Sequence, residues 1–269
     1  MNILITSGST REMIDPSHYM SGLFGGSIGA LLGEECSMKS EVEQIFFVHS
    51  RDARYPFEST SMDDSPFSMD HWKEKVTLYP ADTIEDLEHQ ITSILENHVV
   101  DVVVHLMSIH NYGKSNLHFI DNAQDAEDFI HYISGIYGID INILPAHRPI
   151  YKEMESGFNH LFIEQTPTPK LMDLFREHPS SPMIISSKMN VSKNPQDVLK
   201  KAKRSLAKNN TDFVIALDHY AYQENYNEIV HLVHPGDEIE TFDRYEKASK
   251  RVVSLIKERF SDRRKETDV

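Results

Sequence analysis

Small residues and glycines near the start of the chain are the first candidates for chemistry. They are Gly8, Ser9 and Thr10 after a short apolar run, and Gly25, Gly26 and Ser27 before an apolar segment. Glycine lets backbone N–H groups approach an anion closely, and a helix N-terminus adds partial positive charge. The spacing matches neither G-x-G-x-x-G nor G-x-x-x-x-G-K-[ST]. Two interpretations stay open on pattern alone: a phosphate cradle, or a tight turn packed against a strand at a distance that only glycine permits.

Polar residues that follow apolar runs are the next candidates, because α/β sheets bind ligands at the carboxyl ends of their strands. Lys188 follows one such run, Asp218 follows a second, and Met107–Tyr112 follows a third. A lysine in that position would place its positive charge at the crevice beyond the strand ends, although an ordinary surface lysine fits the same pattern. The 15 histidines show no H-E-x-x-H spacing, so we expect no structural metal site. No tyrosine is followed by lysine four positions later, which removes a short-chain dehydrogenase.

The candidate residues lie between predicted strands and helices, which alternate along the chain and would position them. Apolar, β-branched runs predict strands, and apolar residues at helical spacing after capping residues predict helices. The predicted strands are 2–7, 44–49, 75–78, 99–104, 161–164, 183–185, 213–216 and 229–233; the predicted helices are 28–35, 84–95, 125–136, 171–177, 195–206 and 242–260. This alternation predicts an α/β fold with a doubly wound, Rossmann-like parallel sheet in three layers. Ser50–Trp72 is predicted as a long loop, and Leu144–Gly157 as a small excursion from the sheet.

Length and composition bound the remaining possibilities. A chain of 269 residues fits one large domain over residues 1–262 with a charged tail over residues 263–269. The formal net charge of −15 argues against a nucleic-acid surface, which needs clustered Lys and Arg. Cys36 is the one cysteine, so no internal disulfide can form. No signal peptide or membrane-spanning run is present. We expect a cytoplasmic protein that does not bind membranes.

Several motifs in order resemble those of the phosphopantothenoylcysteine synthetase family, the ligase of coenzyme A biosynthesis, in its free-standing bacterial form. The similar segments are Ile3–Thr10 (opening strand and Gly-Gly-Thr turn), Ser21–Gly29 (glycine loop), Val102–Tyr112 (strand ending in Ser-Asp-Tyr), Lys152–Ser156 (Lys-Ile-Ser-Ser), Pro167–Lys170 (Pro-Lys), Ser187–Met189 (Phe-Lys-Leu) and Lys200–Asp218 (Ala-Asn-Asp). Each motif alone is weak, but seven in the family's order are fairly specific.

The resemblance implies a two-step ligation. The carboxylate of phosphopantothenate attacks the α-phosphate of CTP (ATP in eukaryotes), pyrophosphate leaves, and the amine of cysteine displaces the nucleotide to form an amide. The site would neutralise the triphosphate with Mg²⁺ and lysines. The resemblance implies that Lys152 and Lys188 are the catalytic residues and supply positive charge near the nucleotide. It also implies that the nucleotide lies near Asn111 and Asp218. The residues that would bind phosphate are Gly8, Ser9, Thr10, Gly25, Gly26 and Ser27. The resembled family commonly forms homodimers, so the resemblance also implies a homodimer.

Three departures from the family's motifs keep an alternative open. Gly22 stands where the family has an asparagine near the acyl intermediate, Leu217 replaces an asparagine, and Asn111 replaces an aspartate. The two leading hypotheses are therefore a CTP- or ATP-dependent ligase for a phosphopantothenate-like acid and a cysteine-like amine, and a catalytically altered paralogue that binds a nucleotide or metabolite as a regulator. An unrelated Rossmann-like reductase is the third.

Overall fold

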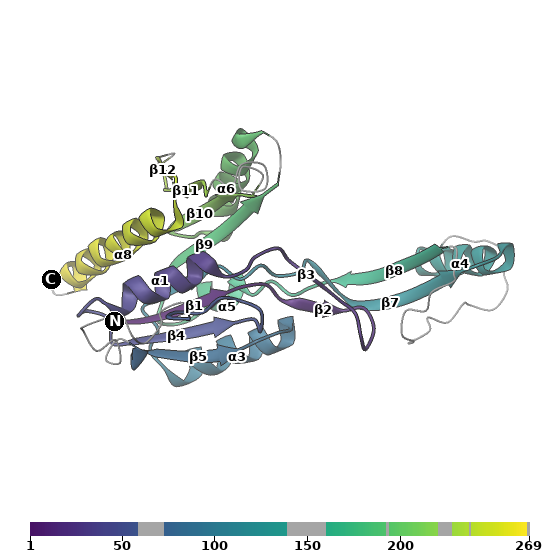
Figure 1. Ribbon diagram of the computed structural model, residues 1–269, viewed down its shortest axis with the longest axis horizontal. Coiled ribbons are helices and arrows are strands. Elements are labelled where there is room, and N and C mark those ends of the chain that lie inside the picture. Colours follow the sequence, from purple (N-terminus) through teal and green to yellow (C-terminus); the bar gives the residue numbers. More distant parts are fainter. Residues whose placement is uncertain (59–72, 139–159, 192–193, 220–227, 237, 268–269) are drawn as a thin grey trace. The chain divides into compact units, whose positions relative to one another are not determined.

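The computed structural model describes residues 1–58, 73–138, 160–191, 194–219, 228–236 and 238–267 (Figure 1). The chain divides into two compact units. Unit 1 comprises Met1–Thr10, Leu23–Ile109 and Lys170–Val269, and unit 2 comprises Arg11–Gly22 and His110–Pro169. These units are defined by contacts within the chain. That residues 1–262 fold together as one domain stays a prediction. Within the described ranges, no helix is long and apolar enough to cross a membrane.

Unit 1 is built on an eight-stranded sheet in the order β12-β11-β10-β9-β6-β1-β4-β5. The strands are β1 (Asn2–Ser7), β4 (Gln44–His49), β5 (Val76–Pro80), β6 (Val102–His105), β9 (Met183–Asn190), β10 (Phe213–Asp218), β11 (Val230–Val233) and β12 (Ile239–Phe242). All neighbours from β10 to β5 pair in parallel, and β11 and β12 add an antiparallel edge. The predicted fold class, an α/β fold with a doubly wound, Rossmann-like parallel sheet, is confirmed, and the antiparallel edge of β11 and β12 is an addition that the sequence did not predict.

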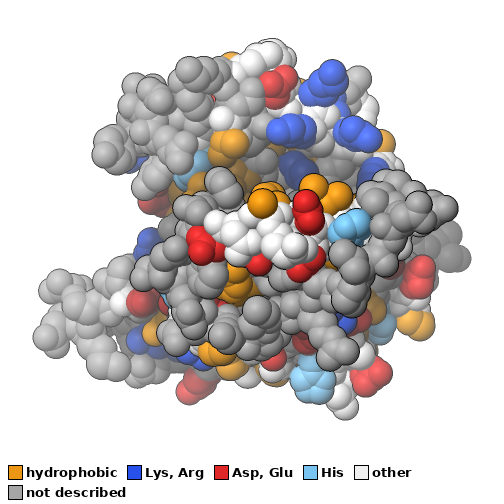
Figure 2. Space-filling view, turned by 90° about the vertical axis from the view of Figure 1, so that its right-hand side faces the viewer, with side chains coloured by type: hydrophobic (Ala, Val, Ile, Leu, Met, Phe, Trp, Pro, Cys, Tyr) orange, Lys and Arg blue, Asp and Glu red, His pale blue; other side chains and the backbone are white. Residues whose placement is uncertain are grey.

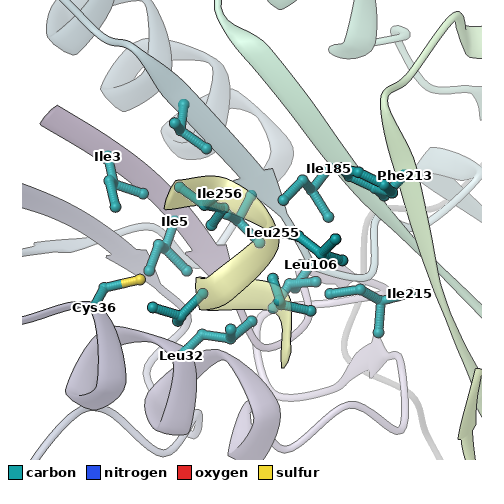
Figure 3. Packing of buried hydrophobic residues seen from close by; sticks show 14 of the residues in the cluster. Ile3, Ile5, Leu32, Cys36, Leu106, Ile185, Phe213, Ile215, Leu255 and Ile256 are labelled. Carbon is teal, nitrogen blue, oxygen red and sulfur yellow. The ribbon is translucent and has the colours of Figure 1, made fainter. Parts of the chain in front are cut away.

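Helices cover both faces of this sheet and make three layers. One face packs against α1 (Ser27–Ser37) and α8 (Tyr245–Thr267) through the largest hydrophobic cluster, part of which Figure 3 shows between Ile5, Leu32 and Ile256. The other face packs against α3 (Ile84–Asn97), α5 (Met172–Arg176) and α6 (Pro195–Asn209). Strands buried on both faces need apolar residues at successive positions, as Ile3, Leu4 and Ile5 provide.

Local capping residues fix where two of these helices begin. The Thr83 hydroxyl accepts a hydrogen bond from the Asp86 N–H, and the Asp86 carboxylate accepts one from the Thr83 N–H, which is a capping box. At the start of α6 the Asn194 side chain accepts from the Gln196 N–H, and Pro195 occupies the first helical position. At the other end of the chain, residues 263–267, expected as a tail, continue α8.

Unit 2 contains a short hairpin and a long two-stranded ribbon. The hairpin pairs β2 (Arg11–Met13) with β3 (Tyr19–Ser21), and the ribbon pairs β7 (Tyr112–Ile120) with β8 (His160–Pro167), with α4 (Ala123–Ile136) packed against β7 (Figure 1). Sequence patterns did not predict β2, β3 or β7. Their residues mix polar and apolar types, and β7 includes a register shift after Gly113. The predicted excursion over residues 144–157 lies outside the described residues.

Candidate ligand site

The order of the strands identifies the part of unit 1 where a ligand is expected. From β1 the chain adds β4 and β5 on one side, and β6 then returns to the other side of β1. This reversal is a topological switch point, and open α/β sheets bind ligands there, outside the carboxyl ends of the strands. The Gly8–Thr10 turn follows β1 at this point, and Leu106–Ser108 follows β6.

Backbone hydrogen bonds close the gap between these two segments. The Ser108 N–H donates to the Gly8 carbonyl at 2.8 Å, and the Thr10 N–H donates to the Ser108 carbonyl at 2.9 Å. Ser9 and Ser108 form a parallel bridge just beyond the strands. Because the Thr10 N–H is already bonded, it is not available to a phosphate in this conformation.

Ser9 ties the turn after β1 to the glycine loop. Its N–H donates to the Ser50 Oγ at 3.1 Å. Its hydroxyl accepts from the Phe24 N–H and donates to the Phe24 carbonyl, both at 3.2 Å, and the residue is almost fully buried. Ser9 therefore positions Phe24 in this conformation, where both its N–H and its hydroxyl are engaged within the protein.

Close packing accounts for most of the glycines around α1. A Cβ on Gly8 (φ +94°) would lie 2.2 Å from the Ser50 Oγ, and a Cβ on Gly29 would lie 2.2 Å from the Ser7 Oγ. Gly26 has a φ of +80° and lies against Ala53. The tight-contact interpretation left open by the sequence thus describes these three positions. Gly25 differs, because a Cβ there would meet open space.

The N-terminus of α1 has the features of an anion site. Gly26 is its N-cap and supplies no side-chain hydrogen bond, and the first turn contains no acidic residue. The free N–H groups and the positive end of the helix dipole are thus uncompensated by any side chain of this turn. Gly25 is exposed and Ser27 is half-buried. We call Gly25, Gly26 and Ser27 the glycine-loop site.

Sequence reasoning missed a segment that packs against the glycine loop. The Arg54 N–H donates to the Gly25 carbonyl at 2.9 Å, and the Ala53 side chain lies against Gly8 and Gly26. These residues fall at the start of the predicted loop 50–72, whose residues 59–72 lie outside the described part. The available signal was the pair Arg51 and Arg54, two cations directly after a buried strand.

Lys188 and Asp218 lie at the same carboxyl edge of the sheet. Lys188 is exposed on β9 and pairs in register with Ala216 of β10, two residues before Asp218. Asp218 is buried, and its N–H donates to the Ile229 carbonyl at 3.2 Å. β9 is separated from β1 by β6 alone, a span of about 10 Å at the usual strand spacing.

Two further predicted site residues lie outside the described part of unit 1. Lys152 lies outside the described residues. Asn111 belongs to unit 2, where it is exposed and its carbonyl accepts from the Thr168 N–H at 3.0 Å. Cys36 is fully buried in unit 1, and burial raises the pKa of its thiol to about 12, so it is not a thiolate nucleophile.

Comparison with known proteins places this fold. No family model matches the chain. A curated relative, the coenzyme A biosynthesis bifunctional protein CoaBC of Thermococcus kodakarensis, is 19% identical over 228 residues, which are 85% of this chain and 44% of that protein. The chain therefore spans less than half the length of this relative.

Solved structures match over nearly the whole chain. The DNA/pantothenate metabolism flavoprotein of Streptococcus pneumoniae has a TM-score of 0.72 at 17% identity, covering 96% of this chain and 98% of that one. A Cab2 mutant in complex with phosphopantothenate-cysteine has a TM-score of 0.66 at 16% identity, covering 100% and 89%. The C-terminal domain of CoaBC has a TM-score of 0.61 at 17% identity, covering 97% and 96%.

Fold and site define a doubly wound α/β protein with a glycine loop at its switch point. The resemblance to the phosphopantothenoylcysteine synthetase family, expected from the motifs, is confirmed by the CoaBC relative and by the shared fold.

Proposed function

We propose that this protein is a nucleotide-dependent ligase of coenzyme A biosynthesis that joins a phosphopantothenate-like acid to a cysteine-like amine. One observation carries the proposal: an uncapped helix N-terminus with an open glycine, Gly25, at the switch point of this fold. Phosphate groups bind at such termini. The relatives named above, one of which was solved with phosphopantothenate-cysteine, supply the class of substrate.

The chemistry assigns a role to each part of the site. A carboxylate oxygen of the acid attacks the α-phosphorus of CTP or ATP, and the bond to pyrophosphate breaks. The amine nitrogen then attacks the acyl carbon, loses a proton and expels the nucleotide monophosphate. In this proposal the N–H groups at Gly26 and Ser27 bind phosphate oxygens, and the Lys188 ammonium stabilises the charge that develops on the departing pyrophosphate. Lys152 keeps the same role as a prediction.

Mg²⁺ fits this arrangement as a partner of the triphosphate. Within the described ranges no group of three His, Cys, Asp or Glu side chains converges on one point. Mg²⁺ needs no such cage, because it commonly binds substrate phosphates with one or two carboxylates and several waters. Asp218 is the carboxylate at the sheet edge next to Lys188, and we assign it this contact. The metal would neutralise phosphate charge.

A second candidate function rests on specific substitutions. Gly22 and Leu217 cannot donate the side-chain hydrogen bonds that the resembled family makes at these positions, and Asn111 lacks a carboxylate. Losing one donor to a developing oxyanion commonly lowers a rate by about 10²- to 10³-fold. A protein that binds the nucleotide without ligation, as a regulator, agrees with these three residues.

The segment Ser50–Arg54, which packs against the glycine loop, offers a direct test of nucleotide binding. Arg54→Gln is expected to weaken CTP or ATP binding by about tenfold, because it removes a positive charge from the residue whose N–H donates to the Gly25 carbonyl. Arg51→Gln is the matched control on the same turn, since the Arg51 side chain is exposed and paired with Asp82 at 3.0 Å. Calorimetry with Mg²⁺ measures both. Equal affinity in the two variants would show that Arg54 does not contribute to nucleotide binding. If the wild type binds neither CTP nor ATP, the proposed nucleotide site is contradicted.

We extend the proposal to a homodimer in the cytoplasm. α4 exposes an apolar stripe at helical spacing: Ile130, Ile133, Ile136 and the adjoining Tyr137. Exposed apolar patches of this kind mark contact surfaces. Ile130→Lys is expected to give a monomer in sedimentation velocity, and Glu127→Lys on the same helix is the control that keeps the stripe. A monomeric wild type at micromolar concentration contradicts the dimer.

A further inference from the structure

A buried threonine–histidine pair links the last residues of β1 and β6. Thr6 and His105 are neighbours in the parallel register, and Thr6 Oγ1 lies 2.7 Å from His105 Nδ1. Both residues are buried, Thr6 completely. The same Oγ1 accepts a hydrogen bond from the Met107 N–H at 3.2 Å. One hydroxyl thus connects the β1 strand, the β6 strand and the segment that follows β6.

The hydrogen bonds of Thr6 define the protonation state of His105. Among the described residues, the Thr6 hydroxyl has no acceptor other than His105 Nδ1, and its oxygen already accepts from Met107. The hydroxyl proton is therefore donated to Nδ1, and the imidazole is neutral with its own proton on Nε2. Burial against the Phe175 ring, whose centroid lies 5.5 Å away, also favours the neutral form.

The pair lies directly before the contacts that shape the switch point. The Leu106 N–H donates to the Thr6 carbonyl at 3.0 Å, and the Ser108 N–H donates to the Gly8 carbonyl two residues further along both segments. The Thr10 N–H then donates to Ser108. Without the Thr6 hydroxyl, the Met107 N–H would lose its partner in a buried position, which is costly and favours movement of this segment.

We propose that Thr6 and His105 are positioning residues for the glycine-loop site. They hold Leu106–Ser108 against the Gly8–Thr10 turn, and this turn holds Phe24 and the loop through the Ser9 hydroxyl. The inference rests on the proposed function for its ligand, a nucleoside triphosphate. Its structural part, the ordering of the turn by the pair, is independent of which ligand binds.

Thr6→Val tests the pair, because valine keeps the shape and removes the hydroxyl. It is expected to weaken CTP or ATP binding by about tenfold, measured by calorimetry with Mg²⁺. It should also speed amide hydrogen exchange at Thr10 and Ser108. Thr6→Ser, which retains the hydroxyl, should restore both properties. Ring ¹⁵N NMR of the wild type should show an unprotonated His105 Nδ1 that accepts a hydrogen bond, and Thr6→Val should shift this signal.

Val252→Ala is the matched control, since it lowers stability from the α8 side of the core without touching this pair. If Thr6→Val changes binding and exchange no more than Val252→Ala does, the pair only packs and the inference is overturned. If the wild type binds neither nucleotide while Thr6→Val still speeds exchange at Thr10, the proposed function fails and the positioning role stands. A protonated Nδ1 in the wild type would also overturn the assignment.

Discussion

The neutral state of His105 makes the stability of unit 1 depend on pH. Burial lowers the pKa of His105 from 6.5 to about 4. Between these values the unfolded chain binds a proton that the folded chain does not, so the free energy of unfolding falls as the pH decreases through this window. The loss contributed by this one group is about 3 kcal/mol at its full extent.

Urea unfolding at pH 7.5, 6 and 5 measures this effect. The wild type is expected to lose stability progressively below about pH 6.5. His105→Asn, which can still accept from the Thr6 hydroxyl, should show a shallower decline over the same range. If the two proteins decline in parallel, another group titrates in this window and His105 is protonated in the folded state.

Candidate site residues could be located from the sequence where they lie near the carboxyl end of a strand. Lys188 and Asp218 were found this way, because apolar runs locate the strands, and the two residues lie near the carboxyl ends of β9 and β10. Their roles in the reaction stay predictions. The partners of the glycine loop, Ser50 and Arg54, depend on the register of β1 with β4, which brings Ser50 beside Ser9. No local pattern encodes that pairing.

At the scale of elements, two glycines near the N-terminus of α1 allow packing and ligand binding to be tested separately. Gly29→Ala would place a Cβ 2.2 Å from the Ser7 Oγ, so it should lower the free energy of unfolding by about 1–3 kcal/mol. Gly25→Ala meets open space and has no positive φ, so its stability should match the wild type. Its added methyl group should nevertheless weaken nucleotide binding if an anion contacts this loop.

Thermal unfolding and calorimetry on the two variants separate these effects. A Gly25→Ala variant that is as stable as the wild type and binds as tightly would show that the anion lies elsewhere. A fully stable Gly29→Ala variant would contradict the close contact between α1 and β1.

Elements were predictable where burial on both faces dictates the residues. β1 and β4 begin and end where the apolar runs predicted. The predicted strand from Val99 begins instead at Val102, because the Val99 carbonyl and the Asp101 carboxylate both accept hydrogen bonds from Asn2 before the strand starts. In unit 2, an apolar run predicted β8 over residues 161–164, whereas β2, β3 and β7 lack such runs, and pairing rather than propensity defines them.

At the scale of the whole molecule, charge is distributed unevenly. The net charge is −15, yet α6 alone contributes Lys200, Lys201, Lys203, Arg204 and Lys208. Figure 2 shows Lys and Arg side chains gathered at the top of the view, where Figure 1 labels α6. α6 begins just after β9, whose carboxyl end holds Lys188. If the protein is the proposed ligase, we expect its anionic substrates to be attracted to this part of unit 1 despite the acidic total.

The likeness to coenzyme A biosynthesis proteins covers nearly the whole chain, while the substitutions fall at individual positions. A fold supports many functions, so the reaction has to be argued from the site. Gly25, Lys188 and Asp218 favour ligation; Gly22, Leu217 and Asn111 favour binding alone.

Pyrophosphate release with Mg²⁺, phosphopantothenate, cysteine and either CTP or ATP tests the ligase most directly. The account predicts release that requires the acid and a nucleotide, an amide product that also requires cysteine, and a loss of about 10²-fold or more in Lys188→Ala. Nucleotide binding without any pyrophosphate release would contradict the ligase and leave the regulatory function.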